Sequence, residues 1–112
     1  VTLVVSALPA RPSPLAGLRP TPLAGVKVLD LSRVLAGPYA AQILGDLGAD
    51  VLKVEHPDGD ETRRWGPPFV GDTAVYYLTA NRNKRSAVLD FRKEEDRRAL
   101  VQLASEADVL IE

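Results

Sequence analysis

Residues 26–55, VKVLDLSRVLAGPYAAQILGDLGADVLKVE, carry two short apolar runs separated by a segment with helical spacing. The runs 26–31 and 51–54 are rich in β-branched residues, and the segment between them repeats apolar residues at the spacing of one helix face. Gly37-Pro38 suits the start of that helix. Strand, helix and strand in this order predict parallel strands joined by a right-handed crossover. The expected fold class is therefore α/β, with a Rossmann-like open parallel sheet.

Two loops of this βαβ unit are the first places to seek a site, because ligands of open α/β sheets gather at the carboxyl ends of strands. These loops are residues 32–39 and 55–59. The first loop lacks the G-x-G-x-x-G pattern of dinucleotide sites, although Glu55 stands where such sites place an acidic residue. A nicotinamide or flavin function is therefore disfavoured. Backbone N–H groups at the start of the helix could instead receive a phosphate or a carbonyl oxygen.

Composition excludes several classes of function. The 14 basic and 15 acidic residues nearly cancel, which argues against a nucleic-acid partner. The chain has no Cys and one His, so a thiolate nucleophile and a histidine-rich metal site are excluded, and no metal site is predicted. The acidic run 58–61 lacks the remaining ligands of a calcium loop. No apolar run approaches the ~20 residues that span a bilayer, so no membrane partner is expected.

The second half of the chain continues the alternation of strands and helices. Residues 56–74 form a long connection without predicted regular structure, rich in Pro, Gly and Asp. We expect it to pack against the domain through Trp65, Pro67, Pro68 and Phe69. Residues 74–80 suit either a short helix or a strand. We predict a third strand at 87–91, a helix at 93–107 and a fourth strand at 109–111. Two helices are few for four parallel strands, so further sequence or a partner chain is expected to complete the core.

Five basic side chains cluster in this half of the sequence, namely Arg63, Arg64, Arg82, Lys84 and Arg85. They suit either an anionic ligand such as a polyphosphate or a solvated basic face. His56 follows the second predicted strand, where it could hydrogen-bond a ligand or remain an exposed loop residue.

Residues 1–22 contain five prolines and no acidic residue. They are interpreted as a disordered leader or as the remnant of a targeting peptide, although the prolines oppose the amphipathic helix of such peptides. The absence of Cys fits an intracellular compartment, so we expect a cytoplasmic location, and a targeting remnant would make the mitochondrion the alternative. Residues 23–112 form the expected domain, and because the apolar run 109–111 reads as a strand cut off at its end, the domain is expected to be truncated.

Four segments in order resemble the amino-terminal part of the family III CoA transferases of the CaiB/BaiF type. They are PLAGVKVLDLSRVLAGPYAAQILGDLGADVLKVEHP, GDETRRWGPPF, YYLTANRNKRSAVLDF and ALVQLASEADVLIE, and the resemblance spans 22–112. Through LSRVLAGP, TRRWGPPFVG and NRNKRS the chain is most similar to the succinate–hydroxymethylglutarate CoA transferase branch. The α-methylacyl-CoA racemases of the same superfamily shorten the loop before the basic K-R-S, whereas this chain keeps it long.

The resemblance implies an enzyme that moves CoA between an acyl-CoA and a carboxylic acid, with a dicarboxylic acid expected. An aspartate would form a mixed anhydride and then an enzyme-CoA thioester. That aspartate is expected beyond Glu112, so no catalytic residue is assigned here. CoA is implied as a substrate rather than a permanently bound cofactor, and the full-length form as an interlocked homodimer. An acyl-CoA racemase and a non-catalytic nucleotide-binding module are the alternatives.

The resemblance also implies which residues of this chain contact CoA. Leu35 and Ala36 lie in the loop that approaches CoA in relatives, although formyl-CoA transferases carry Gln at the position of Leu35. His56 stands where an Arg commonly binds the nucleotide portion. The remaining contacts are expected at the end of the third strand, where Arg92 would face the CoA phosphates; they are Leu89, Asp90, Phe91 and Arg92.

Overall fold

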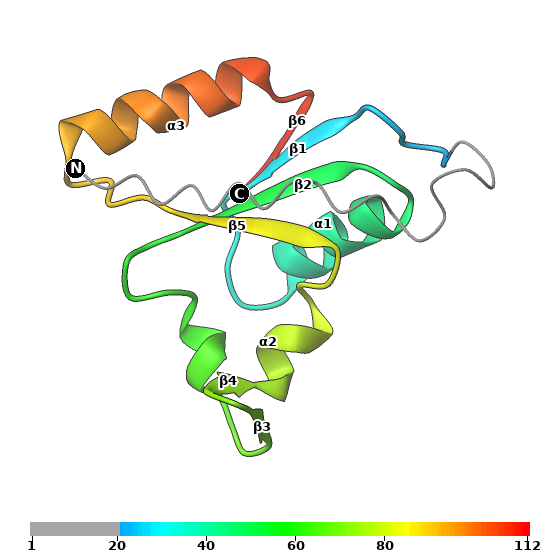
Figure 1. The fold of residues 1–112 in the computed structure, drawn as a ribbon, viewed down its shortest axis with the longest axis vertical. Helices are drawn as coiled ribbons and strands as arrows, with labels where there is room; N and C mark the ends of the chain where they lie inside the picture. Colours follow the sequence, from blue (N-terminus) through cyan, green and yellow to red (C-terminus); the bar gives the residue numbers. More distant parts are fainter. Residues whose placement is uncertain (1–20) are drawn as a thin grey trace.

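The computed structural model describes residues 21–112, and its centre is a four-stranded parallel sheet (Figure 1). The strand order is β5-β2-β1-β6, with β1 at Lys27–Asp30, β2 at Asp50–Glu55, β5 at Lys84–Val88 and β6 at Val109–Ile111. All three pairings are parallel. The predicted α/β fold with an open parallel sheet is therefore confirmed. Of the predicted leader 1–22, only the last two residues lie among those described.

Two helices cover opposite faces of the sheet, α1 at Ala36–Asp46 and α3 at Glu94–Glu106 (Figure 1). Side chains alternate between the faces of a strand, so Val28 and Val51 join Ala41 in one core cluster. On the other face Leu29 and Val54 meet apolar residues of α3. The start of α1 lies within one residue of the predicted Gly37-Pro38, as the sequence pattern indicates.

The third strand differs from the prediction of 87–91. β5 begins at Lys84 and ends at Val88, pairing Lys84 with Val51 and Val88 with Glu55. The reason is that β5 is an edge strand, on which polar residues can pair with the neighbouring strand while their side chains reach solvent or a charged partner. Leu89 to Arg92 therefore form the connection after the strand rather than its end.

The long connection 56–74 contains regular structure, contrary to the prediction. It includes a 3₁₀ turn η1 at Glu61–Arg64 and a small antiparallel pair, β3 at Phe69–Val70 and β4 at Thr73–Ala74. The helix α2 at Val75–Thr79 follows and resolves the choice between helix and strand. Thr62 and Ala74 are fully buried, whereas Trp65 and Phe69 remain about half exposed. Small residues, rather than the expected aromatic ones, thus form the interior of this segment.

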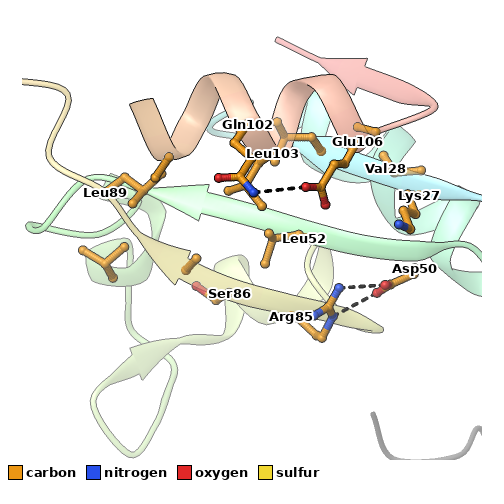
Figure 2. A pocket seen from close by; sticks show the side chains of 15 residues that line it. Lys27, Val28, Asp50, Leu52, Arg85, Ser86, Leu89, Gln102, Leu103 and Glu106 are labelled. Carbon is orange, nitrogen blue, oxygen red and sulfur yellow. Dashed lines mark hydrogen bonds and ion pairs between the residues drawn. The ribbon is translucent and has the colours of Figure 1, made fainter. Parts of the chain in front are cut away.

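A cavity of about 460 Å³ lies between α3 and the sheet (Figure 2). Leu52 and Leu103 face it, and its rim carries an Arg85–Asp50 ion pair and a hydrogen bond from Gln102 to Glu106. No residue of α3 itself is buried. Within residues 21–112, no helix has the length and apolar character needed to cross a membrane.

Candidate functional site

The carboxyl ends of β1, β2 and β5 lie side by side, and the loops that follow them carry all the predicted CoA contacts. Leu35 and Ala36 begin α1 after β1, His56 follows β2, and residues 89–92 follow β5. The Leu89 amide donates to the Glu55 carbonyl oxygen at 3.0 Å, which extends the pairing of β5 with β2 by one residue. The structure therefore brings the three predicted groups together at the carboxyl ends of these neighbouring strands.

A buried aspartate at the end of β1 fixes the loop that follows this strand through hydrogen bonds. Asp30 accepts hydrogen bonds from the backbone N–H of Ser32, at 3.0 Å, and from the Ser32 hydroxyl. Val34 adopts a left-handed φ of +70°, a conformation that β-branched residues rarely adopt. Leu35 then caps α1 without a side-chain hydrogen bond. The start of α1 thus presents backbone rather than side-chain groups at the sheet edge.

The Lys84 side chain lies between the end of β1 and the first turn of α1. Its ammonium lies 2.8 Å from Asp30 Oδ2, and both side chains are almost completely buried. It also donates to the Pro38 carbonyl at 2.7 Å and to Asn81 Oδ1 at 2.8 Å. Burial lowers the pKa of Lys84, and the neighbouring Asp30 opposes that effect. The ion pair links the carboxyl end of β1, the first turn of α1 and the chain before β5.

Glu55 ends β2 inside a second buried cluster. Arg63 donates to both of its carboxylate oxygens, and the Tyr77 hydroxyl donates to Oε1 at 2.7 Å. Burial alone would raise the pKa of Glu55, but the hydrogen bonds from Arg63 and Tyr77 hold it at about 2. The same burial and the nearby carboxylate raise the pKa of Tyr77. Glu55 is therefore committed to this cluster and does not reach out toward a ribose.

A second buried cation, Lys53, was not singled out by the sequence analysis. It lies two residues before Glu55 on β2, and its ammonium contacts Ser32 and Asp60. A lysine inside an apolar strand was the available signal, since a charge on a buried strand face needs a partner. Tyr77 was also missed, because no local pattern distinguishes it from the neighbouring Tyr76.

His56 and Arg92 are the exposed polar members of the predicted site. The His56 side chain is 45% exposed, and its Nδ1 accepts a hydrogen bond from the Asp58 amide at 3.2 Å. The Arg92 side chain is 76% exposed and donates to both oxygens of Asp90, at 2.8 and 2.9 Å. Hydrogen bonds from Arg92 hold the pKa of Asp90 at about 2. Both exposed side chains can therefore reach a ligand at the carboxyl ends of the strands, and Arg92 does so beside an anion.

The predicted basic cluster does not form a common anion site. Arg63 pairs with Glu55, Lys84 with Asp30, Arg82 with Asp46 and Arg85 with Asp50. Each carboxylate lies eight or more residues away along the chain, so the pairing could not be read from local sequence. Four of the five positive charges are thus balanced by carboxylates within the fold. Among the described residues, no group of three or more potential ligands is placed to hold a metal ion.

The chain is an α/β protein with an open parallel sheet, and its polar loops follow the carboxyl ends of the strands. Residues 23–112 match CoA-transferase family III. The chain belongs to this family, and similar proteins are named CoA-transferases.

Similar proteins support this assignment. The human succinyl-CoA:glutarate CoA-transferase is 54% identical over 85 residues, which are 75% of this chain and 19% of the human protein. The succinate–glutarate CoA-transferase of Agrobacterium fabrum is 50% identical and covers 94% of this chain and 26% of its own length. A crystal structure of a CaiB/BaiF family protein from Brucella suis superposes with a TM-score of 0.79 at 54% identity, covering 82% of this chain and 25% of that one. The chain thus spans about a fifth to a quarter of the length of these relatives.

Proposed function

We propose that residues 23–112 supply one wall of the CoA site of an enzyme that transfers CoA between dicarboxylic acids. The observation that carries the proposal is the shared sheet edge, where the backbone at the start of α1 lies with the loops that hold His56 and Arg92. Backbone N–H groups and exposed cations are the groups that bind the phosphates of a nucleotide. Leu35 and Ala36 would contact CoA through backbone atoms, and Leu89, Asp90 and Phe91 would line the same edge.

The proposed reaction proceeds through an aspartate beyond Glu112. Its carboxylate attacks the thioester carbonyl of the acyl-CoA, the C–S bond breaks, and a mixed anhydride and CoA thiolate result. The thiolate then attacks the aspartyl carbonyl, which releases the first acid and leaves an aspartyl-CoA thioester. The second carboxylate displaces CoA from that thioester to give a new anhydride. Attack of CoA on the acyl carbonyl forms the new acyl-CoA and frees the aspartate.

The substrate class rests on the similar proteins. Relatives named for succinyl-CoA or succinate with glutarate, and for succinyl-CoA with mesaconate, share 48–54% identity with this chain. We infer succinyl-CoA as donor and a short dicarboxylate such as glutarate as acceptor. The complete enzyme is proposed to be an interlocked homodimer, a proposal supported by the uncovered faces of α1 and α3: Tyr39, Ile43 and Val101 are 44–68% exposed.

The test incubates the complete polypeptide that contains this chain with succinyl-CoA and glutarate, and follows glutaryl-CoA and free succinate by mass spectrometry. Equal formation of the two products is expected, together with capture of an aspartyl hydroxamate when hydroxylamine is added to enzyme and succinyl-CoA. Exchange of the α-hydrogen of a 2-methylacyl-CoA with deuterated solvent, without CoA transfer, would instead support the racemase. CoA binding with neither reaction would support a non-catalytic module.

A further inference from the structure

We propose that Lys53 is a positioning residue that joins the loop after β1 to the loop after β2. Its side chain lies on the α1 face of the sheet, since it alternates with Leu52 and Val54, which pack toward α3. The side chain is 1% exposed, so it cannot itself serve as a ligand for substrate phosphates. Its role must be exercised through the groups that it contacts.

The Lys53 ammonium contacts one group in each loop. It donates to the Ser32 carbonyl oxygen at 2.8 Å and lies 3.2 Å from Asp60 Oδ2. Apart from Lys53, this Asp60 oxygen meets no hydrogen-bond donor among the described residues. A single buried cation therefore bridges two segments that are 28 positions apart in the sequence.

Both ends of this bridge are fixed by further hydrogen bonds. Asp30 holds Ser32 through its amide and its hydroxyl. Asp60 Oδ1 accepts from the Thr62 amide at 2.9 Å and from the Thr62 hydroxyl at 2.7 Å. The Asp60 amide in turn donates to Glu55 Oε2 at 2.8 Å. The bridge thus connects two rigid anchors, so that displacement of one loop is transmitted to the other.

This connection bears on the proposed CoA site and rests on that proposal. Ser32 lies three residues before Leu35, and Asp60 lies four residues after His56. A buried ion pair adds little stability compared with a well-packed apolar pair, so stability alone does not explain its presence. What it fixes is the separation between the start of α1 and the His56 loop, which must match the spacing of the ligand groups held between them.

The functional test compares Lys53→Met, Asp60→Asn and the Lys53→Met/Asp60→Asn double variant in the complete enzyme. The double variant removes both buried charges together and keeps the test open if Lys53→Met alone does not fold. We expect the KM for the acyl-CoA donor to rise about tenfold in each variant while kcat changes less than twofold, because the loops misplace the cofactor without touching the reacting atoms. Arg85→Met is the control, since it removes a half-exposed cation paired with Asp50 at the other end of β2. Its kinetics should equal those of the wild type.

Hydrogen exchange tests the connection independently of turnover. In the Lys53→Met and double variants, amides of residues 32–36 and 58–62 should both exchange faster, while those of the β1–β2 pairing keep their wild-type rates. Faster exchange in one loop only, or unchanged exchange and KM in the folded double variant, would overturn the inference. A wild-type enzyme that neither binds nor transfers CoA would refute the proposed function, whereas faster exchange in both loops would still support the connection.

Discussion

Arg63 and Glu55 form a two-point ion pair, with Nε 2.8 Å from Oε2 and Nη2 2.7 Å from Oε1. The guanidinium also lies over the Tyr77 ring, 3.9 Å from its centroid. Glu55 closes β2 and Arg63 belongs to η1, so the pair attaches the segment 56–80 to the carboxyl edge of the sheet. The planar fork of Arg makes such a pair directional, which a lysine at the same position could not reproduce.

The first prediction concerns acid stability. The pKa of Glu55 falls from 4.5 to about 2 on folding, so its ionised form favours the folded state above pH 4.5. That contribution, about 3 kcal/mol, is lost as the pH falls from 4.5 through 2. Glu55→Gln binds no proton in this range and should show a shallower fall of unfolding free energy, with lower stability at pH 7. Urea titrations at several pH values check this, and parallel wild-type and variant curves would contradict it.

The second prediction concerns the buried pair beneath α1. Lys84→Met leaves the fully buried Asp30 without its cation and should lower the free energy of unfolding by roughly 3–5 kcal/mol. Arg85→Met is the matched control one residue further along β5. Its pair with Asp50 is half exposed on both sides, so that loss should stay below about 1 kcal/mol. Chemical denaturation of both variants measures the two losses of unfolding free energy. Equal losses would show that burial does not set the strength of these ion pairs.

Strand β5 could be predicted from the sequence only in part. The apolar runs that form β1 and β2 and the helical spacing in α1 could be predicted, because burial imposes these patterns locally. The start of β5 could not, since the charge of the buried Lys84 side chain is compensated by Asp30, 54 positions earlier. The same limit applies to the basic residues, whose carboxylate partners come from distant elements. The sequence therefore predicts which loops follow the strands. It does not predict which carboxylate pairs with each basic residue, because those partners are brought together only by the tertiary structure.

The third prediction concerns the close approach of α1 to the loop after β1. A methyl group at Gly37 would overlap the Ser32 side chain, so Gly37→Ala must displace that loop. We expect a loss of roughly 1–3 kcal/mol in unfolding free energy and a higher KM for the acyl-CoA. Gly45→Ala, on the same helix, is the control. Its added methyl would lie no closer than 3.2 Å to the Asn83 carbonyl oxygen, which predicts a smaller loss and an unchanged KM. Thermal unfolding and initial rates measure both, and a higher KM for Gly45→Ala would argue against a specific effect of the loop.

The last prediction assigns Arg92 to the phosphates of CoA. Its side chain is 76% exposed and already shares its charge with Asp90, so its attraction for a phosphate should weaken as salt screens it. Arg92→Ala should raise the KM for acyl-CoA about tenfold with little change in kcat.

The decisive comparison uses an acyl-pantetheine, which offers the same thioester without phosphates. Its KM should be unaffected by Arg92→Ala. Arg98→Ala on α3, where the side chain is 78% exposed and pairs with Glu94, provides the control for loss of a surface cation. An equal rise in KM for acyl-CoA and acyl-pantetheine would place the role of Arg92 in the structure of the loop after β5, because only a direct phosphate contact distinguishes the two substrates.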